Sequence, residues 1–201
     1  MNLLPWLVIP GAYLLGGVSP GYWLVRMRTG TDVRTQGSGA TGATNVARTL
    51  GSRGFILVML LDTLKGAIAA ILARTFGLTG GWEFAAAAAV VGGHIWPVQL
   101  GFRGGRGLSP LLGAWLVLAP VAIGACLVIA GIAWAISRQR VWSGLFGALV
   151  LPGTTWWVTR SLPAAGFAGV TFCMVALSHR SHWQRPEPSR ATSRGGESSP
   201  L

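Results

Sequence analysis

The sequence predicts an all-α, polytopic integral membrane protein, and three observations support this class. Of its 201 residues, 51% are apolar and only 10% are charged, which is too apolar for an ordinary soluble domain. Several windows of roughly 20 residues carry few or no charges, and a helix of that length crosses a hydrocarbon core. The net charge of +11 comes mostly from arginines that flank these windows, so it indicates a membrane surface and no nucleic acid.

The apolar windows define the expected spans. The first window lacks a basic segment before it and a small-residue cleavage pattern after it, so we expect it to remain as the first span. Tryptophans lie near the ends of most windows, where they typically anchor a helix at the headgroups. The windows cover residues 3–25, 54–73, 82–100, 108–136, 141–159 and 162–177.

The window at 108–136 decides the topology, because Pro120 lies near its middle. One long helix there gives six spans, and two short helices give seven. With seven spans and the N-terminus outside, thirteen arginines lie on one side and two on the other; with six, the division is eight to seven. The positive-inside rule therefore favours seven spans and a cytoplasmic C-terminus. We expect one transmembrane domain over 1–185 and a disordered tail at 186–201.

A polar cassette, GSGATGATNVARTLG, stands at 37–51 between two apolar windows. Glycines let the backbone turn tightly and bring N–H groups against an anion, with hydroxyls beside them. Arg48 adds a planar charge suited to phosphate. The alternative is a flexible loop whose small residues pack against helices. The expected anion-binding residues are Gly37, Ser38, Gly39, Thr41, Gly42, Thr44 and Asn45.

A second cassette, GFRGGRG at 101–107, places Arg103 and Arg106 among glycines where an apolar run begins. This pattern is typical of an anion site at a helix entrance. Arginines there could equally serve as a positive-inside anchor. We expect this cassette to face the cytoplasm together with the first one.

Polar residues inside or beside the membrane windows form the remaining candidates. Asp62 and Lys65 stand three apart on one helical face, so we expect them to pair. His94 lies near the cytoplasmic end of its window and could bind substrate or pack. The third cassette, SHRSHWQR at 178–185, carries His179 and His182, which could bind phosphate, polarise a carbonyl or anchor the helix. Two histidines without a nearby carboxylate are weak ligands, so we expect no metal and no cofactor.

These cassettes, in this order, resemble those of the PlsY family, the bacterial membrane glycerol-3-phosphate acyltransferases that use acyl phosphate. The resemblance extends from the first span to about residue 185. GSGATGATNVARTLG is similar to the family's GSGNxGATNxxRxLG, with Ala40 replacing Asn. DTLKG at 62–66 is similar to DxLKG, and GHIWPVQLGFRGGRG at 93–107 is similar to GHxFPVxLxFKGGKG. The third cassette departs from RHRxNIxRLxxGxE, because His182 replaces Asn and the Gly and Glu have no counterpart.

The resemblance implies transfer of a fatty acyl group from acyl phosphate to the 1-hydroxyl of glycerol 3-phosphate, the first step of phospholipid synthesis. It implies a multi-pass protein of the bacterial cytoplasmic membrane whose site faces the cytoplasm. Its partners would be the two substrates, the lipid bilayer and the enzyme that produces acyl phosphate.

The resemblance and the residue patterns together assign the site residues. The expected catalytic residues are Ser38, Arg48, Arg106, His179 and His182. The expected substrate-binding residues are Gly37, Gly39, Thr41, Gly42, Thr44, Asn45, Lys65, His94, Arg103, Gly104, Gly105 and Gly107. Two alternatives stay open. One is a homologue that binds lipid precursors without turnover, which the altered third cassette supports. The other is a small transporter of anionic lipids, since seven spans with charged residues in the membrane could line a path.

Overall fold

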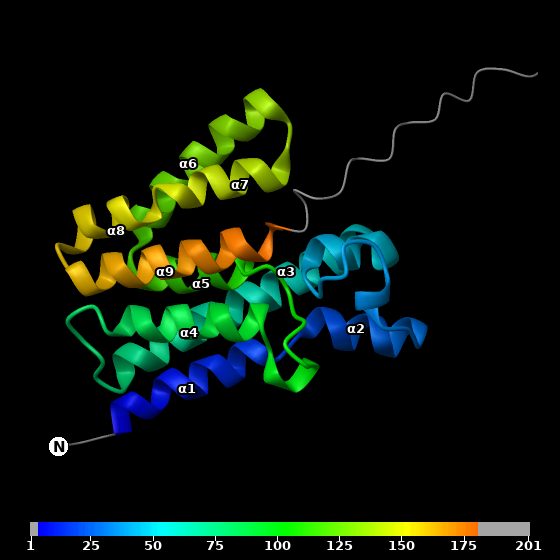
Figure 1. The fold of residues 1–201 in the computed structure, drawn as a ribbon, viewed down its shortest axis with the longest axis horizontal. Coiled ribbons are helices and arrows are strands. Elements are labelled where there is room, and N and C mark those ends of the chain that lie inside the picture. The colour runs from blue at the N-terminus through cyan, green and yellow to red at the C-terminus, as the bar shows by residue number, and fades with distance from the viewer. Residues whose placement is uncertain (1–3, 181–201) are drawn as a thin grey trace, which may run out of the picture.

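The computed structural model describes residues 4–180, and the regular structure of this part of the chain is helical (Figure 1). The elements are α1 (Leu4–Gly17), α2 (Pro20–Thr29), η1 (Val33–Thr35), α3 (Ala43–Thr75), α4 (Glu83–Ile95), η2 (Val98–Leu100), α5 (Leu108–Leu118), α6 (Pro120–Ser137), α7 (Arg140–Leu149), α8 (Leu151–Thr159) and α9 (Leu162–Ser178). The predicted all-α class is confirmed for these residues.

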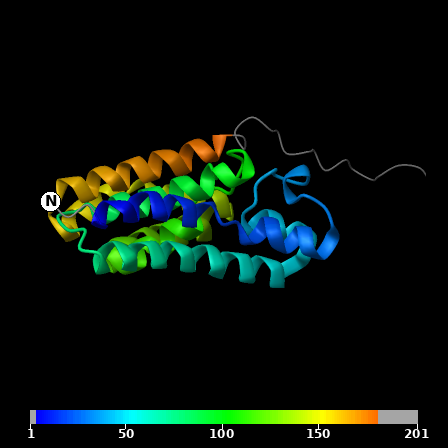
Figure 2. The same ribbon diagram turned by 90° about the horizontal axis from the view of Figure 1, so that it is seen from below.

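Most helices run roughly along the long axis of the molecule. The alanine-rich helix α4 packs against α1, α3, α5 and α9, while α6 packs against α7 and α8. Helix α2 and the beginning of α3 extend past one end of this bundle (Figures 1 and 2). Polar segments can therefore collect at that end without interrupting the packed core.

Prolines break three of the apolar windows. The first window is not one helix as expected, because α1 ends at Gly17 and Pro20 starts α2. The break expected near Pro120 is confirmed, since α5 ends at Leu118 and α6 begins at Pro120. The window at 141–159 divides at Val150, with a proline in the first turn of α8. Proline suits a first turn, because it has no N–H to donate there.

The helix surfaces are strongly apolar. Within residues 4–180, α3 and α6 are long and apolar enough to cross a membrane, and α5 and α9 are shorter apolar helices. Helix α3 is bent at Gly51, whose φ of 66° lies in the left-handed region. Large side chains such as Leu60, Leu64 and Ile132 are more than half exposed, as expected for a surface that contacts lipid.

Two glycines allow α3 and α5 to cross in close contact. A Cβ on Gly66 would overlap the carbonyl oxygen of Pro110, and a Cβ on Gly113 would overlap that of Thr63. Small residues at a crossing let two membrane helices approach until their backbones touch. This crossing fixes α3, which begins at the first cassette, against α5, which begins at the second.

Gly113→Ala is therefore expected to destabilise the protein by about 1–3 kcal/mol, because the added methyl group separates α3 from α5. Thermal unfolding of the purified protein in detergent measures the effect. Gly124→Ala is the matched control, since no atom lies within 4 Å of its added Cβ. Equal unfolding temperatures for the two variants would contradict the close crossing.

The two ends of the bundle differ in their contacts. Val141, at the start of α7, lies with the first and second cassettes around one cavity. At the other end, Arg74 donates to the carbonyls of Val117 and Leu118, where α5 stops. Ser161 donates to the carbonyl of Gly80 at that end too. Helix α5 therefore runs from the cassette end to the far end.

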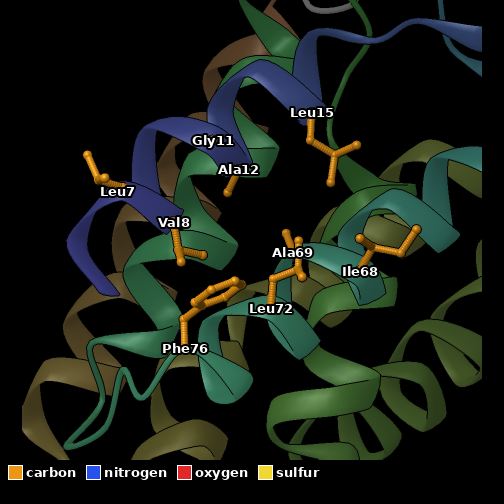
Figure 3. Close-up of a pocket in the computed structure, with 9 residues that line it drawn as sticks. All are labelled: Leu7, Val8, Gly11, Ala12, Leu15, Ile68, Ala69, Leu72 and Phe76. Carbon is orange, nitrogen blue, oxygen red and sulfur yellow. The ribbon is translucent and has the colours of Figure 1, made fainter. Parts of the chain in front are cut away.

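An apolar groove of about 410 Å³ lies between α1 and α3 (Figure 3). Val8 of α1 points toward Leu72 and Phe76 of α3, Leu7 lies at the outer edge of the groove, and Gly11 and Ala12 leave room between the helices. The lining carries no polar side chain, so the groove offers no group for acid–base or anion chemistry. The candidate site lies elsewhere.

Candidate active site

The first cassette, the second cassette and the described part of the third, residues 178–180, meet at one end of the bundle and enclose two adjoining chambers. We call the first the polar chamber; it has a volume of about 340 Å³. It is lined by Ser38, Gly39, Ala40, Ile95, Trp96, Phe102, Arg103, Gly104, Gly105, Arg106, Leu177, Ser178 and Arg180. Its three arginines come from two different cassettes, so only the folded chain brings them together.

The second, which we call the mixed chamber, has a volume of about 390 Å³. It is lined by Ser38, Ala40, Gly42, Ala43, Thr44, Asn45, Ala47, Arg48, Phe55, Met59, Arg106, Leu108, Ser109, Val141 and His179. Ser38, Ala40 and Arg106 line both chambers. The mixed chamber thus combines a polar part, near Ser38 and Arg48, with apolar side chains of α3 and α7.

Asn45 holds the first cassette in shape. Its Oδ1 accepts a hydrogen bond from the backbone N–H of Ser38 at 2.9 Å. Its Nδ2 donates to the carbonyls of Val33 and Ala40, each at 2.9 Å, and of Gln36 at 3.1 Å. Although Asn45 lines the mixed chamber as expected of a binding residue, its amide is already committed to the loop.

Backbone hydrogen bonds hold the second cassette against α4. The N–H of Gly104 donates to the carbonyl of Ile95 at 3.1 Å, and that of Gly105 donates to the carbonyl of His94 at 2.9 Å. Gly104 and Gly105 are expected substrate-binding residues, but carbonyls of α4 accept the hydrogen bonds of their N–H groups. The charge that this cassette presents to the polar chamber therefore comes from the side chains of Arg103 and Arg106.

Further hydrogen bonds tie the cassettes to one another. The N–H of Thr41 donates to the carbonyl of Gly104 at 3.1 Å. The hydroxyl of Ser178, at the end of α9, donates to the carbonyl of Arg106 at 3.1 Å. The site is consequently one connected unit and not three independent loops.

Two helices begin at the mixed chamber. The first turn of α3 follows its N-cap Gly42, and the first turn of α5 follows its N-cap Gly107; neither N-cap has a side chain to bond the helix. Helix N-termini carry a partial positive charge and unpaired N–H groups, which favour anions. None of the residues that line either chamber is acidic. The site is therefore electrostatically suited to phosphate.

An ion pair supports the outer edge of the first cassette. Arg34 donates to both carboxylate oxygens of Asp32, with a closest N–O distance of 2.8 Å, and to the carbonyl of Leu100 at 2.7 Å. The hydrogen bonds from Arg34 hold the pKa of Asp32 below its usual value. The pair's stabilisation is thus present above the unfolded carboxyl's pKa and is lost as the pH falls through the lowered value. Both residues line a third cavity, which adjoins the polar chamber at Gly39 and Arg103.

The structure brings most of the expected site residues together. Those that line a chamber are Ser38, Gly39, Gly42, Thr44, Asn45, Arg48, Arg103, Gly104, Gly105, Arg106 and His179. Those that line neither chamber are Gly37, Thr41, Lys65, His94 and Gly107. His182 lies outside the described residues, as does the expected tail at 186–201.

The expected ion pair between Asp62 and Lys65 is confirmed, with Nζ 2.8 Å from Oδ1. His94 joins it, because its Nδ1 lies 2.9 Å from the Lys65 Nζ. All three side chains are buried. Lys65 and His94 therefore form a buried network that lines neither chamber.

Sequence reasoning missed the apolar part of the mixed chamber. Phe55 and Met59 stand one helical turn apart on α3, and Val141 faces them from the start of α7. The helical spacing of Phe55 and Met59 was a usable signal. Without the packing of α7, however, they could not be distinguished from side chains that face lipid.

Known proteins similar to this chain share one activity in their names. A family model described as glycerol-3-phosphate acyltransferase matches residues 6–186. The chain is 43% identical over 175 residues to glycerol-3-phosphate acyltransferase 1 of Desulfitobacterium hafniense (strain Y51), covering 87% of each protein. It is 40% identical over 181 residues to the glycerol-3-phosphate acyltransferase of Synechococcus sp. (strain JA-2-3B'a(2-13)), covering 89% of each.

The fold is similar to that of a solved membrane enzyme. Crystal structures of PlsY, an integral membrane glycerol 3-phosphate acyltransferase, match over 90% of both chains. The glycerol 3-phosphate form gives a TM-score of 0.83 at 28% identity. The lysophosphatidic acid form gives 0.80 at 27%.

Proposed function

The chain belongs to the glycerol-3-phosphate acyltransferase family, of which PlsY is a member, and on this premise we propose its reaction. The protein transfers a fatty acyl group from acyl phosphate to the 1-hydroxyl of glycerol 3-phosphate. The products are 1-acylglycerol 3-phosphate, which is lysophosphatidic acid, and inorganic phosphate. The enzyme that makes acyl phosphate would supply the donor.

The observation that carries this proposal is the pair of chambers that share Ser38, Ala40 and Arg106. The polar chamber, with its three arginines, suits glycerol 3-phosphate, which is small and doubly charged. The mixed chamber suits acyl phosphate, because the phosphate would lie near Arg48 and the acyl chain along Phe55 and Met59. The reacting groups then meet at the shared wall.

The proposed chemistry requires positioning and stabilisation of negative charge. The 1-hydroxyl oxygen attacks the carbonyl carbon, the bond from that carbon to the bridging phosphate oxygen breaks, and the hydroxyl proton passes to the departing phosphate. Ser38 and Arg106, on the shared wall, would donate hydrogen bonds to the carbonyl oxygen as its charge develops. Arg48 would stabilise the leaving phosphate.

His179 is the described histidine in the chambers. Its Nδ1 lies 2.8 Å from the carbonyl of Val175, and a carbonyl can only accept. The ring proton is therefore on Nδ1, and the ring orientation is fixed. In the proposed site, His179 orients the donor phosphate in the mixed chamber, and His182 remains a second candidate for that role.

We also propose seven spans, with the N-terminus outside and the site facing the cytoplasm. Helix α5 runs away from the site and α6 returns toward it, since Val141 lies in the mixed chamber. Arg74 and Arg160 fall at the far end of the bundle, whereas the described arginines of the three cassettes fall at the site end. This distribution agrees with the positive-inside rule. The proposed boundaries are a membrane domain at 1–185 and a cytoplasmic tail at 186–201.

Labelling of single cysteines tests this topology. In a background without Cys126 and Cys173, Arg138→Cys is expected to react with a membrane-impermeant maleimide only after the cells are opened. Thr79→Cys, in the turn after α3, is the matched control and is expected to react in intact cells. The reverse pattern, or equal labelling of both positions, would contradict the proposed orientation.

Release of inorganic phosphate tests the activity. Purified protein in detergent, given acyl phosphate and glycerol 3-phosphate, is expected to form lysophosphatidic acid and phosphate in equal amounts. Omission of glycerol 3-phosphate is the control, because hydrolysis alone releases phosphate without the lipid. Failure to form lysophosphatidic acid at high enzyme concentration would rule out the proposed function.

A further inference from the structure

A buried network of Asp62, Lys65 and His94 lies outside both chambers. The exposed fractions of the three side chains are 2%, 5% and 4%. Burying ionised groups in a membrane helix is costly, and such groups are rare unless they are paired and functional. The proposed reaction does not use these residues directly, since none of them lines a chamber.

Lys65 stabilises the end of α1. Its Nζ donates to the carbonyls of Gly16 and Val18, each at 2.8 Å. These carbonyls lie where α1 stops before Pro20. The last carbonyls of a helix have no partner within the helix, and inside a membrane they must find one in the protein. Lys65 supplies that partner from α3.

His94 links Lys65 to the second cassette. The Nδ1 of His94 lies 2.9 Å from the Nζ of Lys65 and 3.4 Å from the Oδ1 of Asp62. On the other side of the ring, a Cβ added to Gly105 would overlap Nε2. The His94 carbonyl also accepts the hydrogen bond from the Gly105 N–H. Both the ring and the backbone of His94 therefore set where Gly105 lies.

The network also reaches the first cassette. Gly104, next to Gly105, accepts the hydrogen bond from the Thr41 N–H, and Thr41 lies between the chamber residues Ala40 and Gly42. A continuous series of contacts thus runs from the end of α1, through Lys65 and His94, to both cassettes. Any shift of His94 would move Gly105 and the adjacent Arg106.

We propose that Asp62, Lys65 and His94 are positioning residues that place the 104–106 segment for binding of glycerol 3-phosphate. This inference rests on the proposed function. Lys65 and His94 are expected substrate-binding residues, and this proposal gives them an indirect role in the same site. Asp62 compensates the charge of Lys65. His94 contacts Lys65 on one side and Gly105, which lines the polar chamber, on the other.

Substitution of His94 tests the proposal. His94→Ala is expected to raise the KM for glycerol 3-phosphate about 10- to 100-fold, because displacement of Gly104 and Gly105 reshapes the polar chamber, which they line. The KM for acyl phosphate is expected to change less than about threefold, since Gly104 and Gly105 do not line the mixed chamber and Arg48 is on α3. His94→Asn keeps an oxygen that can accept from Lys65, so it is expected to recover part of the loss. Equal effects on both KM values would indicate general damage and overturn the proposal.

A double-mutant cycle with Gly105→Ala sharpens the test. In the wild-type protein the added methyl group collides with the His94 ring, so Gly105→Ala alone is expected to raise the KM for glycerol 3-phosphate. When His94 is already Asn or Ala, the collision is absent, and the double variant is expected to be no worse than the His94 variant alone. If the fold-increase in KM of the double variant equals the product of the fold-increases of the two single variants, His94 and Gly105 act independently, and the proposal is overturned.

Two measurements keep the outcome interpretable. Gel filtration in detergent establishes that each variant is monodisperse, and His94→Asn serves as the background if His94→Ala does not fold. Glycerol 3-phosphate binding is also measured by calorimetry, which requires no turnover. If the wild-type protein forms no lysophosphatidic acid, the proposed function fails. The positioning role is still tested, because the Kd for glycerol 3-phosphate can be compared among the wild-type protein, the two single variants and the double variant.

Discussion

Arg106→Ala is expected to reduce kcat/KM by about 10²- to 10³-fold for both acyl phosphate and glycerol 3-phosphate. Arg106 lines both chambers, so it is placed to contact each substrate and the carbonyl oxygen that becomes charged between them. A preorganised cation at that point stabilises the transition state more than either bound substrate. Steady-state kinetics with each substrate varied in turn would measure the loss.

Neighbouring arginines provide the matched controls for Arg106. Arg103 lines the polar chamber but not the mixed one, so Arg103→Ala is expected to raise mainly the KM for glycerol 3-phosphate. Arg48 lines only the mixed chamber, so Arg48→Ala is expected to affect mainly acyl phosphate. Arg106→Lys keeps the charge and is expected to recover much of the activity. If Arg106→Ala affected one substrate alone, the shared-wall arrangement would be wrong.

Ser38→Ala is expected to reduce kcat by about 10²-fold, because its hydroxyl would donate to the developing oxyanion on the shared wall. The change should leave the loop intact. The Ser38 position is held by its backbone N–H, which donates to Asn45, and not by its side chain. The KM values are therefore expected to change much less than kcat.

Ser52→Ala is the control for Ser38→Ala. Ser52 is exposed, lies on α3 just past the first cassette and lines neither chamber, so its removal is expected to leave kcat unchanged. Asn45→Ala is the opposite case, because it removes the contacts that shape the loop. We expect Asn45→Ala to lower both activity and thermal stability. A Ser38→Ala enzyme with wild-type kcat would remove Ser38 from the reaction.

The sequence was sufficient for the features that depend on local chemistry. The helix break at Pro120 follows from the geometry of proline, and the Asp62–Lys65 pair follows from helical spacing. Gly37 and Gly39 adopt positive φ angles of 55° and 72°, as a tight loop requires. These features need only a few neighbouring residues to specify them.

Features that depend on packing were not predictable in this way. The break before Pro20 was not predicted, because the residues on both sides of it are apolar and the hydropathy of the window does not show where a helix ends. Gly104 and Gly105 were expected to bind substrate, yet their N–H groups donate to carbonyls of α4. Which partner a backbone donor takes is decided by long-range contacts, and a glycine motif does not encode those.

The position of Asp62 and Lys65 on a single helix has a consequence for biogenesis. A lone charge at the centre of a membrane helix costs about 2.5–3.5 kcal/mol on insertion scales. The two residues lie one turn apart and contact each other at 2.8 Å, so α3 can enter the bilayer with its charges already neutralised. His94 is synthesised 29 residues after Lys65 and joins a pair that is already in place. Insertion of α3 therefore need not wait for the helix that completes the network.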